Sequence, residues 1–143
     1  MKIKQISLFL ENRAGQLLEI TNILAENGIN MKALNIAETS DYGVLRLIVD
    51  DADKTSAVLK DNGMIVITST VSAVAVPDRM GGLNELLEVI SKSDISIEYM
   101  YSAFGQKDGV AYMIFKVDDI DKFEETLAAN DVNVSGIEEF GLK

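Results

Sequence analysis

The chain of 143 residues contains no cysteine and no histidine. The first absence excludes disulfides, thiolate nucleophiles and thiol redox centres, and the second removes the commonest general base and metal ligand. The sequence also lacks the G-x-S-x-G, G-x-x-x-x-G-K and G-x-G-x-x-G patterns of nucleophile elbows and of phosphate and dinucleotide sites. We therefore expect no cofactor, no metal and no catalytic residues, and we expect that the protein is not an enzyme.

Basic residues are scarce as well. The 13 Lys and Arg residues stand against 23 Asp and Glu residues, which gives a formal net charge of −10 at pH 7. Such a field repels phosphate backbones and anionic lipid headgroups, so nucleic acids and membrane surfaces are disfavoured as partners. The apolar run Leu8-Phe9-Leu10 is cut off by Glu11 and is too short for a signal peptide or a membrane span. We expect a soluble, cytoplasmic protein.

The sequence repeats itself once. Asn12-Arg13-Ala14-Gly15-Gln16-Leu17 aligns with Asp78-Arg79-Met80-Gly81-Gly82-Leu83, and the same register aligns Gly43-Val44 with Gly109-Val110. The register then slips by two residues, and the run from Val49 to Lys54 aligns with the run from Val117 to Lys122. The sequence therefore predicts two tandem domains, residues 1–70 and 71–143.

Each copy reads as strand, helix, strand, strand, helix, strand. Alternating and β-branched residues predict the strands, helical spacing of apolar residues predicts the helices, and Gly28 resembles a helix-ending glycine. In copy one the predicted elements are a strand 6–10, a helix marked by Leu17, Ile20 and Leu24, a hairpin of strands 30–37 and 44–49 turning at 40–43, a helix 51–59 and a strand 64–70. In copy two they are a strand 71–76, a helix marked by Leu83, Leu86 and Ile90, strands near 95–104 and 110–117, a helix marked by Ile120, Phe123 and Leu127, and a strand after Val132.

This order predicts the fold class. It is α+β, with two ferredoxin-like βαββαβ units in tandem, each an antiparallel sheet with helices on one face. No linker rich in proline, glycine or serine separates the copies, since Thr68 to Val76 is nearly unbroken β-prone sequence. Exposed sheet edges are usually covered or paired, so we expect the two units to pair side by side and the chain to form a homodimer.

The loop before the first helix of each copy is the best candidate site. The first N–H groups of a helix lack intrahelical partners and lie at the positive end of its dipole, where a small carboxylate binds readily. Glycine there leaves the backbone accessible, and an amide such as that of Asn12 can both donate and accept hydrogen bonds. The same residues also suit a plain structural turn with an N-cap, which leaves both interpretations open.

The stretches Leu10 to Leu17 and Leu24 to Met31 resemble the signature of the ACT domain, a D/N-R-P-G-x-L loop followed by L-A-x-x-G-I-N-I. Copy two is similar through Asp78 to Leu83 and, more weakly, through Asp94 to Ile97. The resemblance implies a regulatory module that binds a free amino acid at the interface of paired units and signals in trans to a partner enzyme or regulator. An enzyme of amino-acid metabolism is the candidate partner. Residue by residue, it implies ligand-binding positions at Asn12, Arg13, Ala14, Gly15, Gln16, Leu17, Asn30, Asp78, Arg79, Met80, Gly81, Gly82, Leu83 and Ser96.

This sequence departs from the signature where both loops lack the usual proline, which is replaced by Ala14 and Met80. Each loop is therefore less preorganised. A constitutive interaction subunit with a decayed ligand site is the first alternative, and an enzyme that works through carboxylates and tyrosines is the second.

Two further features have structural and functional interpretations. The acidic clusters at 50–53 and 118–121 favour solvated helix caps over cation sites, because the spacing of a calcium loop is missing. Tyr99 and Tyr101 share one face of a predicted strand and could stack on RNA bases or shape a pocket wall. The acidic charge of the chain favours packing over RNA binding for this pair.

Overall fold

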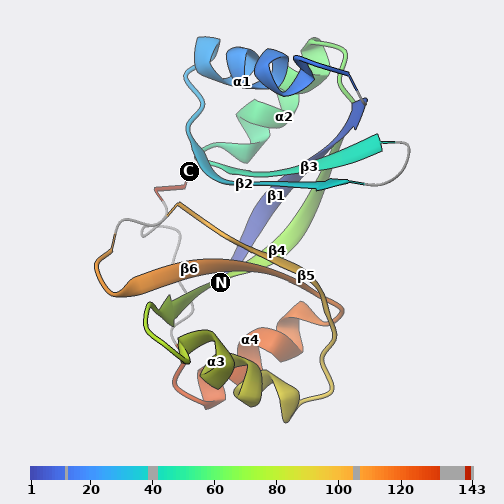
Figure 1. Cartoon of the computed structure of the whole chain (residues 1–143). Helices are drawn as coiled ribbons and strands as arrows, with labels where there is room; N and C mark the ends of the chain where they lie inside the picture. Colours follow the sequence, from blue (N-terminus) through green and yellow to red (C-terminus); the bar gives the residue numbers. More distant parts are fainter. Residues whose placement is uncertain (12, 39–41, 105–106, 133–140, 143) are drawn as a thin grey trace. The chain divides into compact units, whose positions relative to one another are not determined.

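The computed structural model describes the chain except for residues 12, 39–41, 105–106, 133–140 and 143. The described part of the chain contains six strands and four helices (Figure 1). They are β1 (Lys2–Glu11), α1 (Gln16–Glu26), β2 (Met31–Glu38), β3 (Tyr42–Val49), α2 (Ala52–Asp61), β4 (Val66–Pro77), α3 (Gly82–Ser91), β5 (Ile97–Ser102), β6 (Val110–Val117) and α4 (Ile120–Ala129). The predicted α+β fold with ferredoxin-like units is confirmed.

The chain divides into two compact units, and hydrogen bonds link the strands in the order β2-β3-β1-β4-β6-β5. We call Lys4–Ser69 with Gly141–Lys143 the N-terminal unit, and Met1–Ile3 with Thr70–Phe140 the C-terminal unit. The division falls inside β4, since the strands predicted at 64–70 and 71–76 form one strand. The strand predicted after Val132 lies outside the described residues.

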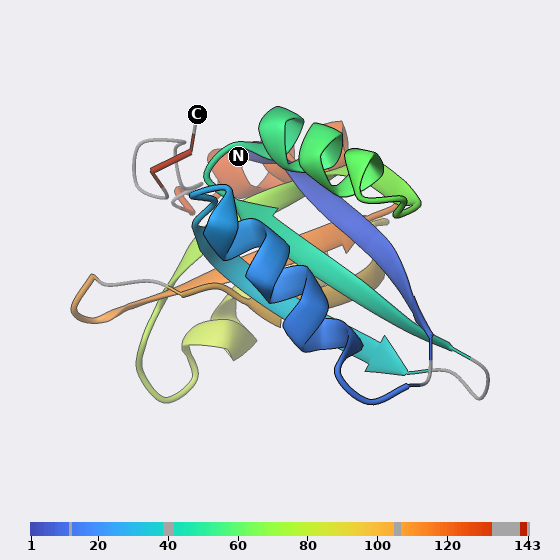
Figure 2. The same cartoon turned by 90° about the horizontal axis from the view of Figure 1, so that it is seen from above.

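In the N-terminal unit, β1 and β2 both pair antiparallel with β3, and α1 and α2 cover one face of these strands (Figure 2). Alternate residues of β1 point to that face, as the period of a strand requires. The buried core beneath the helices is aliphatic, and it consists of Ile6, Leu8, Leu10, Ile20, Leu24, Ile29, Leu45, Leu47, Val49 and Leu59.

The C-terminal unit repeats this arrangement with β4 and β5 paired antiparallel to β6. Its core contains two phenylalanines in contact, Phe115 of β6 and Phe123 of α4, both completely buried. The remaining buried members of this core are Val74, Val76, Leu86, Ile90, Val117 and Leu127.

The end of α1 matches the prediction from the sequence, and the start of β3 does not. Helix α1 closes in a Schellman arrangement, because the N–H of Gly28 donates to Ala25 O and that of Ile29 donates to Leu24 O. The turn predicted at 40–43 is wrong in its second half, since Tyr42 and Gly43 are the first residues of β3 and pair with Glu11 and Leu10. Residues 40 and 41 lie outside the described part.

Candidate functional site

The loops that lead into α1 and α3 have the same backbone geometry. Gly15, the N-cap of α1, has φ 84° and ψ −5°, and Gly81, the N-cap of α3, has φ 83° and ψ −4°. This left-handed conformation disfavours any side chain with a Cβ, which explains glycine at both positions. A Cβ built on either glycine would meet no atom within 4 Å, so the space beside each is open.

These two helices begin differently from the other two. The carboxylate of Asp51 accepts a hydrogen bond of 3.0 Å from the N–H of Lys54 and caps α2, and Asp119 caps α4 through Lys122 at the same distance. Among the described residues, no side chain caps α1 or α3. In α3 the N–H of Gly82 donates to Arg79 O at 3.0 Å, and no described side chain accepts from the other N–H groups in the first turns of α1 and α3.

An exposed ion pair ties each loop to the first turn of its helix. Arg13 Nη2 lies 2.7 Å from Glu19 Oε2, and Arg79 Nη2 lies 2.7 Å from Glu85 Oε2. Each hydrogen bond raises the pKa of its arginine above the ordinary value. The structure repeats this contact in both units.

The remaining loop residues divide into exposed and inward-facing positions. Ala14, Asp78 and Met80 are exposed, and the exposed fraction of Met80 is 98%. Gln16 and Gly82, the first residues of their helices, instead line cavities. Leu17 is half-buried, Leu83 is 38% exposed, and Asn12 lies outside the described residues.

Asn30 and Ser96 lie at the far end of the first helix of their unit. Helix α1 has 11 residues and is therefore about 16 Å long, which separates Asn30 from the loop of the same unit. The backbone N–H of Asn30 donates to Asp50 Oδ1 at 3.1 Å, and that of Ser96 donates to Asp118 Oδ1 at 2.9 Å. Within a single unit the structure does not bring these residues to the loop.

The acidic clusters cap two helices and hydrogen-bond to the backbone at the starts of two strands. Asp51 and Asp119 are the helix caps that the sequence favoured, and Asp50 and Asp118 hold the starts of β2 and β5. In the described part of the chain, no group of three or more acidic side chains is arranged to hold a metal ion. No described helix is long and apolar enough to cross a membrane.

The tyrosine pair does not form an open stacking platform. Tyr99 pairs with Lys116 and Tyr101 pairs with Ile114 in the register of β5 with β6, so the two side chains share a face as predicted. Tyr101 is only 7% exposed. Neither tyrosine lines the cavities described next, and the packing interpretation holds for Tyr101.

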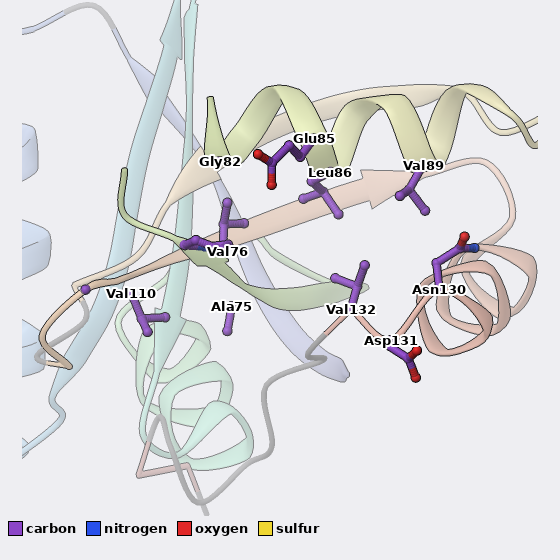
Figure 3. A pocket seen from close by; sticks show the side chains of 12 residues that line it. Ala75, Val76, Gly82, Glu85, Leu86, Val89, Val110, Asn130, Asp131 and Val132 are labelled. Carbon is purple, nitrogen blue, oxygen red and sulfur yellow. The ribbon is translucent and has the colours of Figure 1, made fainter. Parts of the chain in front are cut away.

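Each unit contains a cavity at the same place in its repeat, where the first strand ends and the first helix begins. The cavity of the C-terminal unit has a volume of about 450 Å³ and is walled mainly by aliphatic side chains, among them Val76, Leu86, Val110 and Val132 (Figure 3). The cavity of the N-terminal unit has a volume of about 370 Å³. Neither cavity is predictable from the local sequence, because the turn after the second helix of the unit supplies one wall of each.

Comparisons with known proteins agree with this geometry. A family model described as an ACT domain pair matches residues 1–141. The chain is similar to protein BT0572 from Bacteroides thetaiotaomicron, with 38% identity over 99% of this chain and 96% of that one and a TM-score of 0.91. The ligand-free regulatory subunit of aspartate kinase from Thermus thermophilus shares the fold at 16% identity, with 90% and 92% coverage and a TM-score of 0.64.

No match was found among curated proteins. The family match covers nearly the whole chain, and the duplicated loop geometry explains the signature residues that the two copies share. The chain belongs to the family of ACT domain pairs.

Proposed function

We propose that this protein is a cytoplasmic regulator that binds a free amino acid at paired ACT domains and signals to a partner enzyme in trans. The proposal rests on the backbone geometry and the missing side-chain caps at the starts of α1 and α3. Both helices begin at a left-handed glycine beside open space, and no described side chain caps them, whereas aspartates cap α2 and α4. A ligand carboxylate would satisfy the N–H groups that the protein leaves uncapped.

The ligand site comprises the loop of one unit and the start of the second strand of its paired unit. The loop and helix start of the first copy take the α-carboxylate, and the amides of Asn12 and Asn30 can contact both the α-carboxylate and the α-ammonium group. Asp78 and Ser96 of the second copy contribute a different part of the pocket, where Asp78 attracts the ammonium group. Pairing is required for this assignment, since α1 separates Asn30 from the loop of its own unit. The fold relative from Thermus thermophilus, itself a regulatory subunit of an enzyme, supports a partner in trans.

A thermal-shift screen of the proteinogenic amino acids tests the proposal. A ligand at 100 times its dissociation constant stabilises the folded form by about 2.7 kcal/mol, which raises the Tm of a chain of this size by about 5–11 °C. We expect this shift for one or a few amino acids and no shift for nucleotides. Indifference to all of them would favour the alternative of an interaction subunit with a decayed site.

The two loops should contribute unequally to binding. A carboxylate at Asp78 attracts the ammonium group of the ligand but repels its carboxylate, whereas the neutral Asn12 can contact either. We expect Asn12→Ala to weaken binding by about 1–3 kcal/mol in calorimetric titration, and Asp78→Ala to weaken it less. Loss of binding in Asp78→Ala alone would reverse the assignment of the two loops.

We also propose that the protein is a homodimer. Sedimentation equilibrium should give about twice the monomer mass of 15.6 kDa. A single species at the monomer mass at all working concentrations would contradict this. For the Asn12→Ala and Asp78→Ala variants described above, a melting curve without ligand is the control that each variant keeps its fold.

A further inference from the structure

The turn between α1 and β2 is held by the segment that joins β3 to α2. In the N-terminal unit, Asp50 makes two hydrogen bonds to Asn30. The backbone N–H of Asp50 donates to Asn30 O at 3.0 Å, and the carboxylate Oδ1 of Asp50 accepts from the N–H of Asn30 at 3.1 Å. A single aspartate therefore holds both backbone groups of Asn30.

The C-terminal unit repeats both hydrogen bonds. The N–H of Asp118 donates to Ser96 O at 3.1 Å, and Asp118 Oδ1 accepts from the N–H of Ser96 at 2.9 Å. The residue that is held differs between the copies, asparagine in one and serine in the other, whereas the aspartate is the same. The two copies thus share the position of the backbone and differ in the side chain that it carries.

A lysine adds a second contact to each turn. Lys54 Nζ donates to Asn27 O at 2.6 Å, and Lys122 Nζ donates to Asp94 O at 3.0 Å. The backbone N–H of each lysine donates to the aspartate that caps its helix, which fixes the start of the lysine side chain. In the N-terminal unit the turn is therefore held at both Asn27 and Asn30.

These contacts leave the side chain of Asn30 accessible to a ligand. The N–H of Asn30 is engaged by Asp50, while Asn30 as a whole is exposed. A side chain on a fixed backbone loses less conformational freedom on binding than one on a mobile turn, and this preorganisation raises affinity.

We propose that Asp50 is a positioning residue of the amino-acid site. It holds the backbone of Asn30, so that the amide side chain is in place before the ligand arrives. The inference rests on the proposed function, in which Asn30 contacts the ligand. Asp50 acts through Asn30 and does not touch the ligand itself.

Three variants separate this role from a contribution to stability alone. Asp50→Ala removes the carboxylate acceptor, and Asp50→Asn keeps an oxygen acceptor without the charge. Asp51→Ala is the matched control, because it removes the cap of α2 and leaves both hydrogen bonds of Asn30 in place. The probe is the proteinogenic amino acid with the largest shift in the thermal screen, titrated calorimetrically into the full chain of each variant.

We expect the affinity to follow the acceptor and not the Tm. Asp50→Ala should bind the probe about tenfold more weakly than the parent protein, and Asp50→Asn should stay within about threefold of it. Asp51→Ala should stay within about twofold, although the loss of a helix cap lowers its Tm by a few degrees.

Amide hydrogen exchange measures the positioning without any ligand. In Asp50→Ala the N–H of Asn30 loses its acceptor and should exchange about tenfold faster than in the parent protein. In Asp51→Ala the exchange of this N–H should stay near the parent rate.

Unchanged affinity in Asp50→Ala, or unchanged exchange of the Asn30 N–H, overturns this inference and leaves the proposed function standing. Equal losses of affinity in Asp50→Ala and Asp50→Asn would assign the effect to charge, and equal losses in Asp50→Ala and Asp51→Ala would assign it to stability. Either result also overturns the inference. If the parent protein binds no proteinogenic amino acid, the proposed function and this inference both fail, whatever the exchange rate at Asn30.

Discussion

Replacement of Phe123 by alanine is expected to lower the free energy of unfolding by about 3–5 kcal/mol. Phe123 is completely buried in the core of the C-terminal unit, and its ring lies 5.3 Å from that of Phe115, centroid to centroid. The truncation removes apolar burial and the ring contact together, and it leaves a cavity that a helix packed on a sheet cannot easily close. Chemical denaturation monitored by circular dichroism measures the loss.

The control is Phe104→Ala, because Phe104 is 62% exposed. This substitution should change the free energy of unfolding by no more than about 0.5 kcal/mol. Total stabilities of single domains are about 5–15 kcal/mol, so the Phe123 variant should still fold at low denaturant concentration. Similar losses in the two variants would contradict the assignment of Phe123 to the core.

Gly82→Ala is expected to lower the free energy of unfolding by about 1–3 kcal/mol or more. A Cβ on Gly82 would lie 2.1 Å from the carbonyl oxygen of Pro77, and the obstacle is backbone that cannot rotate away. Helix propensity alone predicts the opposite sign, since alanine is better than glycine in a helix by about 1 kcal/mol. The direction of the measured change therefore decides which effect dominates.

Gly43→Ala is the matched control for the Gly82 substitution. Its Cβ would meet ordinary contacts of 3.6–3.7 Å, to Leu10, Ala37 and Ile36. We expect a change within about 0.5 kcal/mol in denaturant melts of the two variants side by side. A stabilised Gly82→Ala protein would show that the chain between Pro77 and α3 adjusts freely.

The repeat made most of the fold predictable from the sequence. Hydrophobic spacing is local information, and it placed all four helices and the paired strands within a few residues. The matched loops were also visible in the sequence, because only glycine adopts the backbone conformation found at positions 15 and 81 without strain. The boundary near residue 70 stays a prediction, although β4 runs through it as one strand.

Contacts between residues distant in sequence could not be predicted in the same way. The hydrogen bond from the N–H of Asn30 to the carboxylate of Asp50 joins residues 20 apart in the sequence. From the sequence alone, an acidic residue before a helix is interpreted as a helix cap, so this bond could not be predicted. The sequence predicts Gly82 as a ligand-binding position of the loop, whereas the structure shows it as the first residue of α3, buried against Pro77. Among the described residues, Gln16 Oε1 is buried without a hydrogen-bond partner. Which side chains reach this oxygen depends on the folded structure, and no pattern in the sequence encodes that.

The central claim is that α1 and α3 leave N–H groups at their starts for the carboxylate of a free amino acid. Titration of the ¹⁵N-labelled protein with the amino acid selected by the thermal screen, followed by amide NMR, tests it most directly. We predict the largest shifts at Gln16 and Leu17, or at Leu83 and Asn84, with small shifts at the capped starts of α2 and α4. Saturable shifts confined to α2, α4 or the sheet, or no shift with any proteinogenic amino acid, would contradict the claim.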